Sequence, residues 1–154
     1  KTLRKWEPLC CNHVHPRGST LLMECVRTRR CSCRQALMCA KELLERWRAD
    51  PNVEHPSSRM RAIHYCAARG MPKVVKLLLL FGAEIGTSGK ASFTTSIPAN
   101  QMLGARKRRI TGNYTPLEWA RAMKELEIQA GVGLAGIRAL NECIQILEHA
   151  TSTS

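Results

Sequence analysis

The stretch at residues 61–83, RAIHYCAARGMPKVVKLLLLFGA, decides the fold. Its first part places apolar side chains at positions 63, 66 and 67, which is the spacing of one face of a helix. Gly70 ends this helix, because glycine enters the left-handed C-terminal conformation at little cost. Pro72 opens a second helix, where its missing N–H is harmless. The stretch therefore predicts a helix over 62–69, a tight turn, and a second helix that stops at Gly82.

Similar helix pairs are expected on both sides of this stretch. Before it, Ser19 or Thr20 can cap a short helix, and an apolar stripe over 35–47 forms a second one. After it, Thr115 caps a helix with Pro116 at its first position, and residues 137–147 form a last amphipathic helix. Repetition of one supersecondary unit is typical of a solenoid. The predicted fold class is all-α, with repeat units at 19–53, 59–85 and 113–150 inside a domain spanning 19–150 and a frayed tail at 151–154.

The units resemble the ankyrin repeat, whose pattern runs Thr-Pro-Leu-His-x-Ala-Ala, then x-x-Gly, a Val-x-x-Leu-Leu helix and a closing Gly-Ala. The second unit matches best, with Arg61 in the threonine's place, and the third has Glu118 in the histidine's place. The residues that carry the pattern are Thr20, Ile63, His64, Gly70, Gly82, Thr115, Pro116 and Leu117. The resemblance implies an ankyrin-type helical repeat solenoid of about three helix pairs. It also implies that His64 is structural and hydrogen-bonds between neighbouring loops.

The spacing of the units departs from the family. Ankyrin repeats recur about every 33 residues, whereas the equivalent positions Leu22, Ile63 and Leu117 lie 41 and 54 residues apart. The larger excess is an insertion at 86–112, far longer than the usual connection of about 4–6 residues. We expect an ordered finger that reaches a partner; a solvated loop is the alternative. Its candidate contacts are Phe93, Arg106, Lys107, Arg108 and Arg109.

The charge of the chain favours anionic partners. Lysine and arginine total 24 against 12 acidic residues, a net charge of +12. Residues 1–18 are predicted to form a basic extended arm in which Arg4, Lys5 and Trp6 are candidate partner contacts. The other two tryptophans, Trp47 and Trp119, fall on helical stripes and are expected to pack in the interior. No stretch approaches the roughly 18 apolar residues of a transmembrane helix.

The eight cysteines predict a reducing environment. Four of them, Cys25, Cys39, Cys66 and Cys143, fall in apolar helical patterns and are expected to be reduced core residues. The chain is therefore expected inside the cell, in the cytosol or an organelle interior such as the mitochondrial matrix. Residues 10–15 and 31–33 contain cysteine and histidine, but they lack the paired Cys-x2-4-Cys spacing of structural zinc sites. We predict no metal and no cofactor.

Three functions remain open at this point, one of them a cation-rich clamp on an acidic protein or an anionic lipid surface within an organelle. The sequence has no Gly-rich phosphate-binding loop of the Walker or Rossmann type, and an enzyme is not expected. The ankyrin resemblance implies a protein-binding scaffold, here a peripheral subunit of a larger assembly whose partners present acidic surfaces. The charge favours a second reading, an RNA-contacting subunit of a ribonucleoprotein such as an organellar ribosome. None of these functions is expected of an isolated monomer.

Overall fold

The computed structural model describes residues 11–28, 32–94, 109–131 and 133–153. The chain is mostly helical and carries one small two-stranded sheet. The described elements, in chain order, are α2 Leu21–Arg27, α3 Cys33–Glu45, α4 Ala62–Arg69, α5 Pro72–Leu80, β1 Gly89–Thr94, β2 Arg109–Tyr114, α6 Pro116–Ala130 and α7 Leu134–Thr153. Within these residues, no helix is long and apolar enough to cross a membrane.

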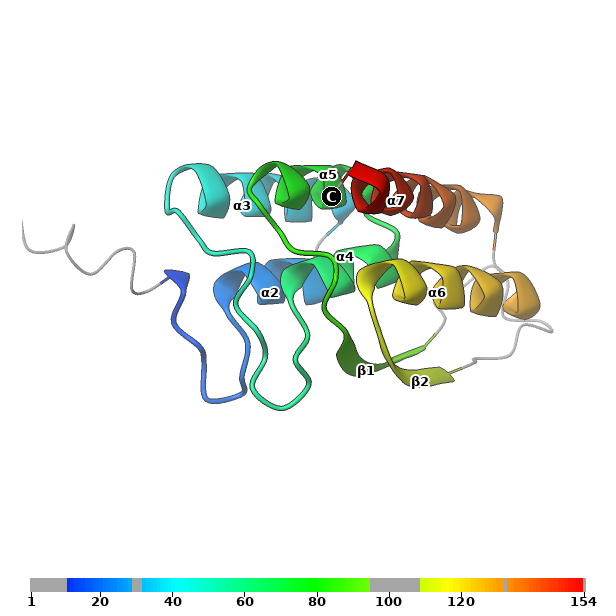
Figure 1. The fold of residues 1–154 in the computed structure, drawn as a ribbon, viewed down its shortest axis with the longest axis horizontal. Coiled ribbons are helices and arrows are strands. Elements are labelled where there is room, and N and C mark those ends of the chain that lie inside the picture. The colour runs from blue at the N-terminus through cyan, green and yellow to red at the C-terminus, as the bar shows by residue number, and fades with distance from the viewer. Residues whose placement is uncertain (1–10, 29–31, 95–108, 132, 154) are drawn as a thin grey trace, which may run out of the picture.

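The helices form three antiparallel pairs that stack side by side (Figure 1). The first members of the pairs, α2, α4 and α6, make an inner row, and the second members, α3, α5 and α7, make an outer row. The loops that connect successive pairs, together with β1 and β2, lie on the far side of the inner row (Figure 1). The three helix pairs predicted from the sequence are therefore present, and α4 has the predicted bounds.

Local sequence signals account for where the inner helices begin and end. The Thr20 hydroxyl accepts a hydrogen bond from Met23 N at the start of α2. Thr115 caps α6 in the same way, and the Glu118 carboxylate reaches back to Thr115 N at 2.8 Å, which completes a capping box. Gly70 ends α4 in the left-handed conformation, at φ 67°. Each of these helices therefore starts or stops where the side-chain chemistry directs it.

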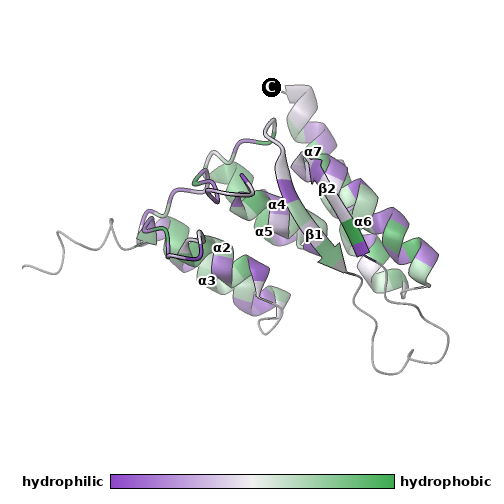
Figure 2. Ribbon diagram, turned by 90° about the horizontal axis from the view of Figure 1, so that it is seen from below, coloured by the Kyte–Doolittle hydropathy of each residue, from purple (hydrophilic) through white to green (hydrophobic). Residues whose placement is uncertain are grey.

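The two-stranded sheet corrects the all-α prediction. β1 and β2 are antiparallel, from Gly89 opposite Tyr114 to Thr94 opposite Arg109. They form the two described ends of the insertion, so residues 113 and 114 belong to the sheet rather than to the third unit. Exposed and half-buried residues alternate along β2, because one face of the sheet packs against α4 and α6 (Figure 2). This period of two was overlooked because each strand has only six residues.

Aromatic rings join the sheet to the helices. Trp119 of α6 is fully buried, and its indole N–H donates to the carbonyl of Gly89 at 3.1 Å. Phe93 meets Trp119 edge-on at 4.9 Å between ring centroids, and Tyr114 meets it edge-on at 5.0 Å. Trp47 of the first unit is half-buried against the main core. Trp119 thus packs in the interior as predicted, whereas Trp47 packs against the core but stays half-buried.

One of the four predicted core cysteines is at the surface and another is only half-buried. Cys66 and Cys143 are buried as expected, but Cys25 is half-buried and Cys39 is exposed. Cys39 lies beyond the stripe of α3 that turns inward, which is formed by Ala36, Ala40 and Leu44. The tail prediction is also wrong for residues 151–153, because α7 runs to Thr153.

Candidate functional site

Three loops lie side by side beneath the inner row of helices. We call residues 11–19 the first loop, residues 50–60 the second loop and residues 84–88, which lead into β1, the third loop (Figure 1). The first loop was expected to be part of an extended arm. It packs on the domain instead, because Cys11 is buried and Gly18 N donates to His15 O in a tight turn. The structure therefore gives the chain a continuous surface of loops along one side.

Equivalent asparagines link each loop to the next. The amide oxygen of Asn12 accepts a hydrogen bond from Asp50 N at 2.7 Å. One unit further on, the amide oxygen of Asn52 accepts from Glu84 N at 2.8 Å. The amide nitrogen of Asn52 also donates to Gly82 O at 2.9 Å. The same contact is thus made twice, between the first and second loops and between the second and third.

Histidines give a second repeated contact. Nδ1 of His15 accepts from Arg17 N at 3.2 Å, and Nδ1 of His55 accepts from Ser57 N at 3.3 Å. His55 therefore carries its proton on Nε2, which donates to Arg17 O at 2.9 Å. The loops approach so closely here that a Cβ on Gly18 would lie 2.4 Å from the His55 ring. Glycine is required at position 18 for this contact, and also for its φ of +90°.

The sequence contained a signal for these contacts that we missed. The pattern Asn-x-x-His-Pro occurs at 12–16 and again at 52–56, 40 residues apart. In each copy the asparagine binds the next backbone segment and the histidine closes its own turn. The first copy lies in the part that we interpreted as an arm, and that interpretation hid the repetition.

His64 joins α4 to the third loop. It is buried; its Nδ1 accepts from Arg61 N at 3.1 Å and its Nε2 donates to Thr87 O at 2.8 Å. Burial lowers the pKa of the imidazole, although the hydrogen bond to Thr87 opposes the effect. The neutral ring satisfies both contacts. His64 therefore makes the structural hydrogen bonds between loops that the sequence predicted.

Arg61, which stands in the threonine's place, clamps two loops together. Its guanidinium donates to Glu54 of the second loop at 2.7 Å and to Glu84 of the third loop at 2.6 Å. Burial disfavours the charged guanidinium, but the hydrogen bonds to Glu84 and Glu54 outweigh it, and the pKa of Arg61 is raised. The same contact lowers the pKa of Glu54. Both carboxylates are thus bound by one guanidinium, and Glu54 lies 3.8 Å from a second one, that of Arg59.

A groove opens between the second loop and β1, below α2 and α4. Its volume is about 480 Å³. It is lined by Arg27, His55, Ser58, Tyr65, Lys90, Ala91, Ser92 and Phe93. Arg27 and Lys90 are exposed and carry positive charge at its rim. The rings of Tyr65 and Phe93 meet edge-on at 6.1 Å and form its apolar part. Burial raises the pKa of Tyr65, so its hydroxyl stays protonated.

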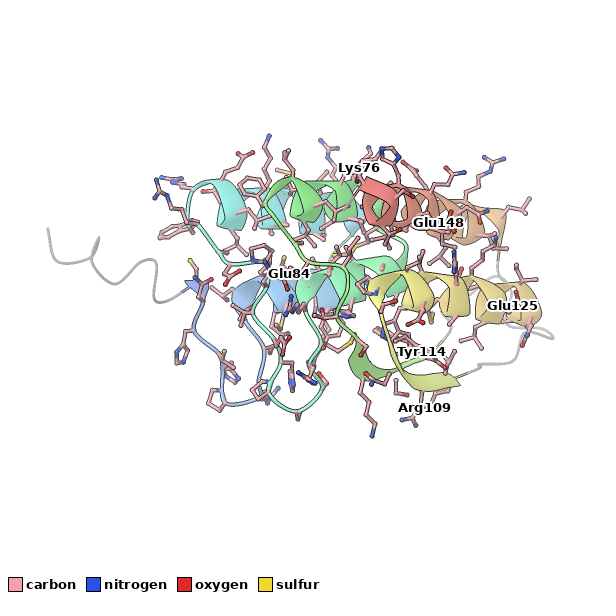
Figure 3. All side chains as sticks on the ribbon, viewed as in Figure 1. Lys76, Glu84, Arg109, Tyr114, Glu125 and Glu148 are labelled. Atoms are coloured by element: carbon pink, nitrogen blue, oxygen red, sulfur yellow. The ribbon has the colours of Figure 1, made fainter. Side chains whose placement is uncertain are left out.

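The predicted contact residues are only partly described. Phe93 lies in the groove, and Arg109 opens β2 on the adjacent strand, where its Nε donates to the Ser92 hydroxyl at 2.5 Å. Arg109 points away from the helices, on the surface opposite to Lys76 of the outer row (Figure 3). The other predicted contacts lie outside the described residues: Arg4, Lys5, Trp6, Arg106, Lys107 and Arg108. We did not predict Arg27, Tyr65 and Lys90 as site residues, because nothing in the sequence indicates which helix the β1–β2 hairpin contacts.

A larger groove of about 600 Å³ lies on the outer row, between α3, α5 and α7. It is lined mainly by apolar groups, including Leu37, the 63% exposed Met38 and Pro72. Its described lining residues make no such loop-to-loop contacts as those beside the groove between the second loop and β1, which we call the inner groove. We therefore take the inner groove as the candidate functional site.

The inner groove combines a cationic rim with an apolar part formed by two aromatic rings. Within the described ranges, no group of three His, Cys, Asp or Glu side chains is placed to hold a metal ion. The two histidines nearest to the groove, His55 and His64, have both ring nitrogens occupied by structural hydrogen bonds. No family model matches the chain, and no characterised protein matches it significantly.

Proposed function

We propose that this chain is a non-catalytic ankyrin-type scaffold that binds a partner protein in the groove between its second loop and β1. The observation that carries the proposal is the repeated cross-linking of the loops, by Asn12 and Asn52 and by His55 and His64. These bonds hold the groove walls in place before a partner arrives, so little conformational entropy is lost on binding. The stacking of three helix pairs in two rows supports the ankyrin resemblance.

The charge of the groove supports a partner with an acidic surface. Arg27 and Lys90 lie at its rim, whereas Glu54 and Glu84, the carboxylates of the adjoining loops, are both bound by Arg61. Electrostatic complementarity of this kind speeds encounter and selects partners. As part of an assembly, the chain would be a peripheral subunit that is held by such contacts.

RNA is the second candidate, and the net charge of +12 favours it. Sequence-specific binding of single-stranded RNA depends on exposed aromatic rings on which bases stack. Among the described residues of the groove, Tyr65 is 8% exposed and Phe93 is covered on one side by Trp119. No ring face of the groove is presented to a base in the way that such recognition needs, so a protein partner is preferred.

A native pull-down with and without RNase, analysed by mass spectrometry, tests the proposal. The double variant Arg27→Glu, Lys90→Glu reverses the charge of the groove. The matched control, Lys73→Glu, Arg138→Glu, makes the same charge change on exposed positions of the outer row. We expect specific protein partners to survive RNase, to be lost from the groove variant and to be retained by the control.

Two results would overturn the proposal. Loss of all partners on RNase treatment would make the chain an RNA-anchored subunit. Equal loss of partners from the groove variant and the control would show that only the total charge matters.

A further inference from the structure

The outer edge of β1 is a hydrogen-bonding edge on which the described residues make one backbone bond, at Lys90. β2 occupies the other edge, and in an antiparallel pair successive residues point their backbone groups alternately toward and away from the partner strand. Lys90 N points away from β2, because it donates to Ser58 O of the second loop at 2.7 Å. Ser92 lies two residues further along and therefore points its N–H and C=O in the same outward direction. In the part of the chain that the structure describes, no partner is seen for these two groups.

The groove runs along this free edge. Ser58 closes it at the end where Lys90 is bonded, and Arg27 and Tyr65 line its helix side, where the Tyr65 ring meets Phe93 edge-on. The Ser58 carbonyl already accepts one bond of the type that a third strand would make. An extended backbone that continued from this point would meet the N–H and C=O of Ser92. The groove thus lies beside the edge at which one further strand would pair.

The charges along the edge are unbalanced. Lys90 and Arg109 form no ion pair with any carboxylate among the residues described. Among the described carboxylates, Arg27 pairs only with Glu24, at 3.7 Å and half exposed to solvent. His55 also lines the groove, and its Nδ1 accepts backbone N–H groups. The fixed charges facing a strand in this position are therefore positive.

We propose that an extended acidic segment of a partner protein adds to the outer edge of β1 as a third strand. This inference rests on the proposed function and specifies how the partner is recognised. The backbone of the segment pairs with Ser92, and its carboxylates face Lys90 and Arg27. Main-chain pairing supplies affinity without regard to sequence, and the cationic rim supplies the preference for acidic side chains.

The test uses short labelled peptides and the whole chain. The probe is a peptide of alternating glutamate and valine. One control is the same peptide with N-methyl groups on the backbone nitrogens that would face β1, and the other is an alternating lysine–valine peptide. Anisotropy gives the affinities, and hydrogen exchange measured by NMR follows the amides of Ser92 and Lys90. The double variant Arg27→Glu, Lys90→Glu and the control Lys73→Glu, Arg138→Glu are measured in parallel.

We expect the glutamate peptide to slow exchange at the Ser92 amide while the Lys90 amide, already bonded to Ser58, changes little. N-methylation should weaken binding by about tenfold or more, which is the loss expected for one or two hydrogen bonds. The lysine peptide should not bind, and the groove variant should lose affinity for the glutamate peptide by about tenfold or more. The outer-row control should bind like the unaltered chain.

The outcomes separate this inference from the proposed function. If N-methylation leaves affinity unchanged, or if the Ser92 amide is not protected, strand addition is wrong even when the pull-down still identifies a groove-dependent protein partner. Strand addition is equally wrong if the glutamate peptide does not bind at all. A single-stranded RNA that binds in place of the peptide, together with RNase-sensitive partners, would overturn both.

Discussion

The middle and last helix pairs have the same local design but differ in how much of each helix is enclosed. In α4 every residue except Arg69 is buried, because α2 and α6 flank it and the hairpin lies beneath it. In the longer α6, the buried residues form a single face: Pro116, Trp119, Ala120, Met123 and Ala130. Both helices end at a left-handed glycine. The comparison indicates that the effect of a substitution on the free energy of unfolding depends on whether a helix has neighbours on both sides, rather than on its local sequence motif.

The largest expected effect is at the centre of the middle pair. Ile63 of α4 is fully buried, so Ile63→Ala removes apolar contacts and leaves a cavity. We expect a loss of about 2–5 kcal/mol in the free energy of unfolding, measured by denaturant titration. The control is Leu134→Ala at the start of α7, where the side chain is 74% exposed and the expected change is within about 0.5 kcal/mol. Similar losses for the two variants would contradict the comparison.

Substitutions of the glycines that end α4 and α6 can distinguish the cost of backbone strain from the cost of disturbed packing. Gly70 and Gly131 have nearly the same φ, +67° and +69°, so alanine should meet the same left-handed penalty of about 1–2 kcal/mol at each. A Cβ at Gly70 would also lie 3.3 Å from Leu140 of α7, whereas at Gly131 it would meet nothing within 4 Å. Gly70→Ala should therefore lower the unfolding free energy more than Gly131→Ala. Equal decreases in the unfolding free energy of the two variants would mean that α7 can shift to accommodate the Cβ at position 70 without cost.

The buried histidine of the middle pair predicts a pH dependence. Burial lowers the pKa of His64 in the folded state, so the unfolded chain binds more protons as the pH falls through the ordinary histidine value of 6.5. The contribution of the neutral His64 ring to the free energy of unfolding is therefore fully present above pH 6.5. It is lost as the pH falls from 6.5 toward the lowered pKa of the folded state. His64→Gln should flatten this part of the stability curve, and His149→Asn, at an exposed position of α7, should leave its slope in place. An unchanged slope in His64→Gln would assign the dependence to another group.

The difference between the pairs also explains what the sequence revealed. Helix 62–69 was predicted to its bounds because its apolar spacing and the left-handed Gly70 at its end agree there. The β1–β2 hairpin was not predicted, because strands of six residues show only a short alternation of exposed and half-buried positions. The insertion was interpreted from its basic residues instead. Lys90 and Arg27 are ordinary surface residues in the sequence. They line one groove only because β1 lies near α2 and α4, a long-range contact with no local signal.

The smallest predicted effect concerns the equivalent turns that close the first and second units. Arg48 and Gly82 each precede a buried alanine, Ala49 and Ala83, and each has positive φ, 51° and 83°. The exposed Arg48 therefore holds a conformation that glycine adopts without strain. Arg48→Gly should relieve about 1–2 kcal/mol of left-handed strain and, after the entropy that glycine adds to the unfolded chain, raise the unfolding free energy by about 0.5–1 kcal/mol. Gly82→Ala, where a Cβ meets nothing within 4 Å, should shift the denaturation midpoint in the opposite direction by a comparable amount. A lower midpoint for Arg48→Gly would mean that the arginine side chain stabilises the first unit by more than its backbone strain costs, and the two turns would then not be equivalent.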